Sequence, residues 1–236
     1  MNNITSKLEI NMFDSLVDPN HLVKFASQNK IPVVIIKNPQ LIPHIHFLRS
    51  STTGHYFKVV LAIDFDARGS NYVISKFANL DPSWIQADGF EIVLTPKENA
   101  VEVMNEVKAL TSYLKRMSPS AEIRYCINMF TFSSKVVENM ILAINQQNDP
   151  RPSFIRIDQS LEASKRDIME YAPKCLQIIR KACTFPVKAS TNVTLDSIRK
   201  LNGQIERFDV SLKNAEVIVS QINAENTPAV IPAADA

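Results

Sequence analysis

Two short apolar segments of this chain each carry one positively charged side chain near their centre. Residues 153–158 read SFIRID, with Arg156 in the middle, and residues 185–190 read FPVKAS, with Lys188. Segments of this kind predict buried strands, so both cations would lie in the interior of the fold. Desolvating a cation is expensive unless it has a partner or a chemical task. The two segments therefore predict either an internal ion network or a reactive site.

The two cations differ in the chemistry open to them. A lysine amine that its surroundings keep neutral can attack a carbonyl carbon and form a Schiff base. A guanidinium has a pKa above about 12 and essentially no neutral population, so Arg156 cannot do this. Arginine instead forms bidentate hydrogen bonds with carboxylates. Lys188 is thus a candidate nucleophile, and Arg156 is a candidate member of an ion network.

The elements that would position these side chains alternate along the chain. Short apolar runs recur with helical patterns between them, which predicts parallel strands joined by crossover helices. Eight such runs favour a single compact (β/α)8 TIM barrel over an open doubly wound sheet. The expected strands are residues 8–12, 32–36, 58–64, 90–94, 123–128, 154–158, 187–190 and 207–211. The expected helices are residues 19–29, 71–80, 98–114, 134–145, 164–181 and 194–201.

Polar residues at the carboxyl ends of the strands are the candidates for a site, because barrel enzymes place their active sites there. Glu91, Arg156 and Lys188 are the candidates for catalysis. Thr95 also lies at such an end. The candidates for lining a ligand pocket are Asp64, Asn128, Asp158, Ser190, Asp209 and Ser211.

Composition excludes several classes of function. The net charge is +2 and both signs are spread along the chain, so we expect no nucleic-acid partner and no membrane partner. No apolar run approaches the roughly 20 residues of a membrane span, and the first residues do not resemble a signal peptide, so we expect a cytoplasmic protein. Only four glycines are present, which excludes Gly-rich phosphate loops, and we expect no cofactor.

Two further expectations concern the ends of the chain and its thiols. Residues 1–222 are expected to form the barrel, and the Pro- and Ala-containing residues 223–236 are expected to form a flexible tail. Cys126, Cys175 and Cys183 lack metal-binding spacing and fit reduced thiols in the core.

The segment that contains Lys188 resembles a signature of the deoxyribose-phosphate aldolase family. Residues 185–198, FPVKASTNVTLDSI, resemble that family's seventh strand, typically VKASGGIRT followed by a helix. Residues 154–160, FIRIDQS, resemble its sixth strand, FVKTSTG, and residues 206–211, ERFDVS, resemble its final TRIGTS. The resemblance implies a (β/α)8 class I aldolase fold.

Earlier segments resemble the same family in the same order. Residues 32–41, PVVIIKNPQL, resemble its second strand with an Asn-Pro turn. Residues 60–69, VLAIDFDARG, followed by Lys76, resemble its VIGFPxG segment, and residues 87–94, ADGFEIVL, resemble its ADEIDMVI strand. The collinear matches cover roughly residues 8–220.

The resemblance implies roles that this chain keeps only in part. In the family a sixth-strand lysine forms the Schiff base, a seventh-strand lysine lowers its pKa, and a fourth-strand aspartate helps to move protons. The corresponding positions here hold Arg156, Lys188 and Glu91. Arg156 breaks the pattern, because it cannot form a Schiff base.

The family's phosphate site is altered as well. The resemblance implies glycines after the seventh strand and at the eighth, where backbone N–H groups approach a phosphate. This chain has Thr191 and Asn192 at the first place and Asp209 at the second. A carboxylate beside a phosphate dianion repels it, so we expect no phosphosugar substrate.

Three hypotheses for function follow. In the first, the barrel has lost the aldolase reaction, and an ion network forms from Arg156, Lys188, Glu91 and Asp158. The protein then binds a small carbonyl ligand or a protein partner, or has a structural role, and it can form a homo-oligomer. In the second, Lys188 serves as the Schiff-base nucleophile of a lyase that acts on a non-phosphorylated carbonyl compound, with Glu91 as general base.

The third hypothesis is a metal-dependent barrel enzyme, suggested by His44 and His46. An HxH pair can bind a metal when it lies on a strand. Residues 43–46 follow the second expected strand and fit a helix or loop better, so solvated histidines are the preferred interpretation and we expect no metal. Trp84, the sole tryptophan, is expected to pack in the core.

Overall fold

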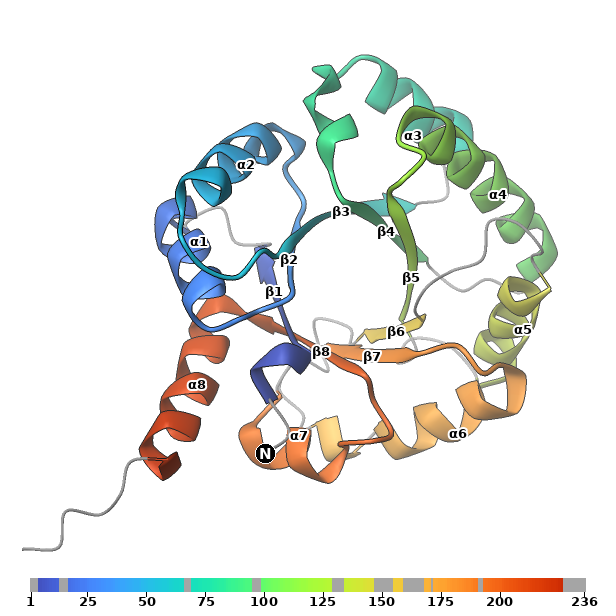
Figure 1. Ribbon diagram of the computed structural model, residues 1–236. Coiled ribbons are helices and arrows are strands. Elements are labelled where there is room, and N and C mark those ends of the chain that lie inside the picture. The colour runs from blue at the N-terminus through green and yellow to red at the C-terminus, as the bar shows by residue number, and fades with distance from the viewer. Residues whose placement is uncertain are drawn as a thin grey trace, which may run out of the picture.

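The computed structural model describes residues 4–12, 17–65, 69–94, 99–128, 134–146, 155–158, 168–170, 172–190 and 193–226. Eight parallel strands close into a barrel in sequence order, with β8 pairing to β1, and helices surround it (Figure 1). The prediction of a (β/α)8 TIM barrel is therefore confirmed. The strands are β1 (Leu8–Met12), β2 (Val33–Ile36), β3 (Lys58–Phe65), β4 (Gly89–Leu94), β5 (Glu122–Asn128), β6 (Ile155–Asp158), β7 (Val187–Ser190) and β8 (Arg207–Ser211).

In the described part of the chain, α-helices and 3-10 turns connect the strands, with one 3-10 turn before β1 and one α-helix after β8. The predicted helices 19–29, 71–80, 98–114, 134–145 and 194–201 are confirmed to within a few residues at their ends. Ten-residue α2 and the long α8 were not predicted. The α-helices are α1 (Pro19–Gln28), α2 (Ile42–Ser51), α3 (Gly69–Ala78), α4 (Ala100–Met117), α5 (Ser134–Asn145), α6 (Ala172–Ala182), α7 (Leu195–Lys200) and α8 (Leu212–Asn226). The 3-10 turns are η1 (Ile4–Lys7), η2 (Pro39–Leu41), η3 (Pro82–Gln86) and η5 (Ile168–Glu170).

Two predicted boundaries differ from the structure. The helix expected over residues 164–181 is described only from η5 onward, and α6 begins at Ala172; residues 159–167 lie outside the described part. The tail was expected from residue 223, but α8 continues to Asn226, so the first four of these residues are helical. Residues 227–236 also lie outside the described part.

Local signals explain why several helices begin where they do. The Asp18 side chain accepts a hydrogen bond from Asn20 N at the start of α1, where Pro19 occupies the first position. Asn99 caps α4 by accepting from Glu102 N. Thr194 and Ser197 form a reciprocal capping box on α7. These side chains satisfy N–H groups that have no partner within the helix.

Replacing Thr194 with alanine tests the capping box. The change removes the bond from Ser197 N to Thr194 Oγ1, so we expect the free energy of unfolding to fall by about 1 kcal/mol. Urea titrations followed by circular dichroism measure the change. Thr53→Ala, at an exposed position between α2 and β3, is the matched control; a loss of equal size in both variants would refute the role of the cap.

The barrel interior is divided into an apolar part and a charged part. Val33 and Ile35 of β2 and Val60 and Ala62 of β3 form a small buried cluster separate from the main core. The main core lies between the strands and the helices, where Trp84 is buried against Phe77, Phe90 and Tyr113, as predicted. Barrel interiors are ordinarily filled with branched apolar side chains. Here β1 and β4 to β8 place ionisable side chains inside instead.

Candidate functional site

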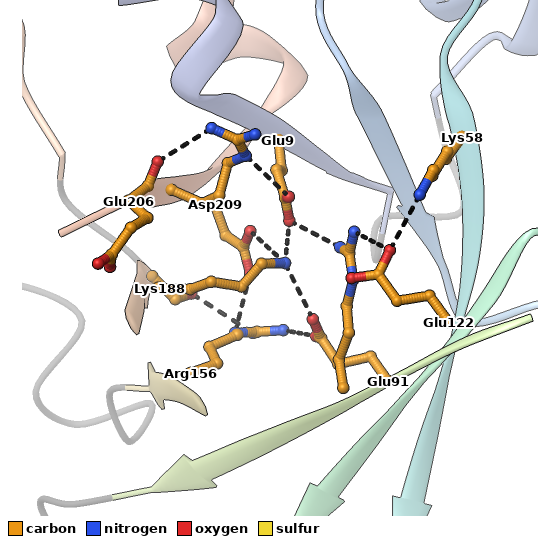
Figure 2. A network of polar contacts seen from close by, with 11 residues as sticks. Glu9, Lys58, Glu91, Glu122, Arg156, Lys188, Glu206 and Asp209 are labelled. Carbon is orange, nitrogen blue, oxygen red and sulfur yellow. Dashed lines mark hydrogen bonds and ion pairs between the residues drawn. The ribbon is translucent and has the colours of Figure 1, made fainter. Parts of the chain in front are cut away.

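Six ionisable side chains from six strands meet inside the barrel. Each is at most 2% exposed; three of them carry carboxyl groups and three carry cationic groups. The strand register places several of them side by side, with Glu9 beside Asp209, Glu91 beside Arg124 and Arg156 beside Lys188. We call this group the interior ion network (Figure 2). Its members are Glu9 (β1), Glu91 (β4), Arg124 (β5), Arg156 (β6), Lys188 (β7) and Asp209 (β8).

Arg156 binds carboxylates on both sides. Its Nη1 donates a hydrogen bond to Glu91 Oε1, and its Nε lies 2.9 Å from Asp209 Oδ2. Its Nη2 is 3.5 Å from Ser190 Oγ, which is also buried. A guanidinium offers donors in a fixed planar arrangement, so these contacts fix its orientation.

Lys188 reaches between three carboxylates (Figure 2). Its Nζ donates to Glu9 Oε2 and lies 3.5 Å from Glu91 Oε2 and 3.8 Å from Asp209 Oδ1. The side chain has an exposed fraction of 0%. The amine is thus enclosed by acidic side chains and closed to solvent.

The interior ion network continues to the amino-terminal mouth of the barrel. Arg124 Nη1 is 3.1 Å from Glu9 Oε2, and Arg124 Nε is 3.0 Å from Glu122 Oε1. Glu122 in turn lies 3.3 Å from the exposed Lys58 Nζ. Lys58 and Glu122 are the first residues of β3 and β5, so this end of the chain of ion pairs meets solvent.

Two members of the network, Glu9 and Arg124, were not among the predicted site residues. Glu9 accepts hydrogen bonds from Lys188, which lies 179 residues away in the sequence, and from Arg124, which lies 115 residues away. The sequence signal that could have found them is the alternation of apolar and polar side chains along a strand. Glu9 in LEINM and Arg124 in EIRYCIN each lie between two apolar residues that face outward. In a strand these positions face the barrel interior.

The carboxylates of the network differ in protonation. Burial raises the pKa of Asp209 to about 8, because it outweighs the attraction of Lys188 and Arg156, and Glu91 and Glu9 add repulsion. Burial would also raise the pKa of Glu9, but the attraction of Arg124 and Lys188 lowers it to about 2. Glu9 is therefore a carboxylate at neutral pH, whereas Asp209 holds a proton over a wide pH range.

The remaining predicted site residues divide into three groups. Ser190 joins the network beside Arg156. Asp64 does not, because its side chain is 64% exposed and pairs with Lys37 at 3.3 Å. Ser211 is exposed, and its Oγ accepts a hydrogen bond from Asn214 N at the start of α8. The side chains of Asn128 and Asp158 and the whole of Thr95 lie outside the described part.

His44 and His46 lie on α2 and not on a strand. Residues two apart on a helix do not face each other, so the HxH pair does not converge on one ion. His46 Nδ1 lies 2.7 Å from Arg49 Nη2, and burial together with Arg49 lowers its pKa. Among the residues that the structure describes, no three His, Cys, Asp or Glu side chains are grouped to hold a metal ion.

The three cysteines are buried thiols, as predicted. Burial raises the pKa of Cys175 to about 11 and also raises that of Cys183, so both stay as thiols at neutral pH. In the described part of the chain, no helix is long and apolar enough to cross a membrane.

Several solved structures that share this fold are aldolases. QR15, an aldolase, matches with a TM-score of 0.69 and 14% identity over 95% of this chain and 99% of its own. The tetrameric deoxyribose phosphate aldolase from Aeropyrum pernix has a TM-score of 0.69 and 11% identity over 94% of this chain and 92% of its own.

A more distant likeness joins the chain to an HpcH/HpaI aldolase/citrate lyase family protein from Burkholderia cenocepacia. Its TM-score is 0.59 and its identity 9%, over 92% of each chain. No protein-family model and no curated protein sequence matches the chain. On this structural likeness, the chain is an aldolase-fold protein that resembles the deoxyribose-phosphate aldolases.

Proposed function

We propose that this protein is an aldolase-fold barrel that has lost Schiff-base chemistry at its centre and acts by binding a ligand or partner. One observation carries the proposal: Arg156, at the position that the resemblance gives to the Schiff-base lysine, is held between Glu91 and Asp209. A guanidinium in this position cannot add to a carbonyl.

The state of Lys188 supports the same conclusion. A lysine nucleophile needs a neutral amine and a path for the carbonyl compound. The Lys188 amine lies against the carboxyl groups of Glu9, Glu91 and Asp209, and its side chain is closed to solvent. The interior of the barrel is therefore suited to an internal ion network that fixes the strands and is poorly suited to substrate binding.

Two further inferences, on the cellular location and on the oligomeric state, belong to this proposal. We infer a cytoplasmic protein, which the buried thiols and the expectation from sequence support. We also infer a homo-oligomer, by analogy with the tetramer formed by the Aeropyrum pernix aldolase.

Borohydride trapping tests the proposed loss of Schiff-base chemistry. The protein is incubated with acetaldehyde, glyceraldehyde or pyruvate, reduced, digested, and mapped by mass spectrometry. We expect surface lysines such as Lys24 to show only weak, concentration-dependent labelling, and we expect Lys188 to remain unmodified. An adduct on Lys188 above the surface level would overturn the proposal.

Arg156→Lys provides a second arm of this test. The variant restores the amine that the family uses, but Glu91 and Asp209 remain in place to pair with it. We expect no adduct at position 156, because the closed network and not only the guanidinium prevents the reaction. Stoichiometric labelling of that lysine would show that the site is open to carbonyl compounds.

A further inference from the structure

A pocket of about 440 Å³ lies outside the interior ion network, at the carboxyl ends of β2 and β3. Its volume falls within the roughly 300–1,000 Å³ of small-molecule sites. Ala62 and Asp64 reach it from the inner face of β3, and Leu61 and Ile63 from the outer face. The pocket thus begins near the carboxyl end of β3, at the end of the barrel where ligands of this fold bind, and extends along the outer face of that strand.

The pocket lies between α3 and η2, the 3-10 turn that precedes α2. α2 packs against α1, η2 and η3, whereas α3 packs against α4. The two helices stand apart on either side of β3 (Figure 1). The walls between them are η2 with the residues before it and the inner side of α3, which supplies Val73, Lys76 and Phe77.

The lining combines an apolar floor with a cationic rim. Leu61, Ile63, Val73 and Phe77 are buried and form the floor, and Tyr72 adds an exposed aromatic ring. Lys37 and Lys76 lie at the rim with Asp64. Lys37 and Asp64 pair at 3.3 Å with both side chains well exposed, and such pairs are weak enough to rearrange around a ligand.

We propose that this pocket binds a small organic anion that has one phosphate, sulfonate or carboxylate group and an apolar body. Two lysines against one aspartate give the rim a net positive charge, which favours an anionic head group, and the floor buries the apolar body. This inference rests on the proposed function in one respect. If the protein acts by binding and the centre of its barrel is closed, the ligand needs a site elsewhere, and this pocket supplies that site.

8-Anilinonaphthalene-1-sulfonate is a suitable probe, because it joins an anionic group to aromatic rings and becomes fluorescent in apolar sites. We expect saturable binding to the folded protein. We expect phenyl phosphate to displace the probe, and benzyl alcohol at the same concentration, which keeps the ring but lacks the charge, to leave it bound. The emission of Trp84, whose ring lies 4.9 Å from that of Phe77 in the pocket floor, should change in parallel.

Charge-matched variants locate the site. We expect Lys37→Gln together with Lys76→Gln to weaken binding of the probe and of phenyl phosphate about tenfold, the effect of losing a charge-assisted hydrogen bond. Lys24→Gln together with Lys174→Gln removes the same charge from exposed positions on α1 and α6 and should leave both affinities unchanged. All four lysines are exposed, so the variants are expected to fold.

The outcomes separate this inference from the proposed function. Equal weakening in both double variants, or no displacement by phenyl phosphate, would overturn the pocket assignment. An aldehyde adduct on Lys188 in the Lys37→Gln, Lys76→Gln variant would overturn the proposed function and leave the pocket assignment untouched.

Discussion

Replacing Lys188 with methionine will lower the free energy of unfolding at pH 7 by about 3–5 kcal/mol, the cost of removing one partner from a buried ion pair. Methionine keeps much of the side-chain length and removes the charge. Glu9 and Glu91 would then lose the buried ammonium group that lies against both of them, and Arg124 and Arg156 would be the remaining cations of the network. Guanidinium titrations followed by Trp84 fluorescence and by circular dichroism measure the loss.

Two companion variants make this result specific to the network. Lys24→Met, at an exposed position on α1, should change stability by less than about 0.5 kcal/mol. Adding Glu9→Gln to Lys188→Met should recover part of the loss, because the double variant no longer leaves that carboxylate without its lysine. A loss below about 1 kcal/mol for Lys188→Met would show that the buried charges contribute little.

The stability of the protein should fall as the pH rises from about 4 to about 8, and Asp209→Asn should remove most of this slope. The pKa of Asp209 is raised from 3.8 to about 8 in the folded protein. Between these values the folded state binds more protons than the unfolded state, so the free energy of unfolding decreases with pH.

Glu9 acts in the opposite direction at lower pH. Its pKa is lowered from 4.5 to about 2, so its contribution is present above about 4.5 and is lost as the pH falls toward 2. Stability should therefore be highest near pH 4 to 5. Denaturant titrations at several pH values measure the profile, with Asp64→Asn as the exposed control. An unchanged slope in Asp209→Asn would refute the assignment of the proton to Asp209.

Strand positions were predictable because each strand is a short apolar run with clear limits. β1, β7 and β8 match the expected residues, and the other strands differ by one residue at one end. α2 was harder to predict, because Pro43 and two histidines obscure its helical pattern. α8 has only a weak apolar face, so its continuation beyond residue 222 was not expected.

The sequence predicted which residues lie in the site better than it predicted which ion pairs they form. Arg156, Lys188 and Glu91 were expected together, and the structure brings them into contact. Asp209 was interpreted as a residue that repels phosphate, and its contact with Arg156 was not foreseen. Glu9 was overlooked, because its pairing with Lys188 depends on β8 closing against β1, and short-range periodicity carries no information on that closure.

Glu9 also bears on how the barrel assembles. Lys188 and Arg124 both depend on this one carboxylate from the first strand, and β1 joins the sheet through β2 on one edge and β8 on the other. A partial barrel without β1 would hold cations in its interior with too few counter-charges. We therefore expect half-barrel intermediates to be disfavoured, and we expect closure of the ring to be coupled to the pairing of these cations.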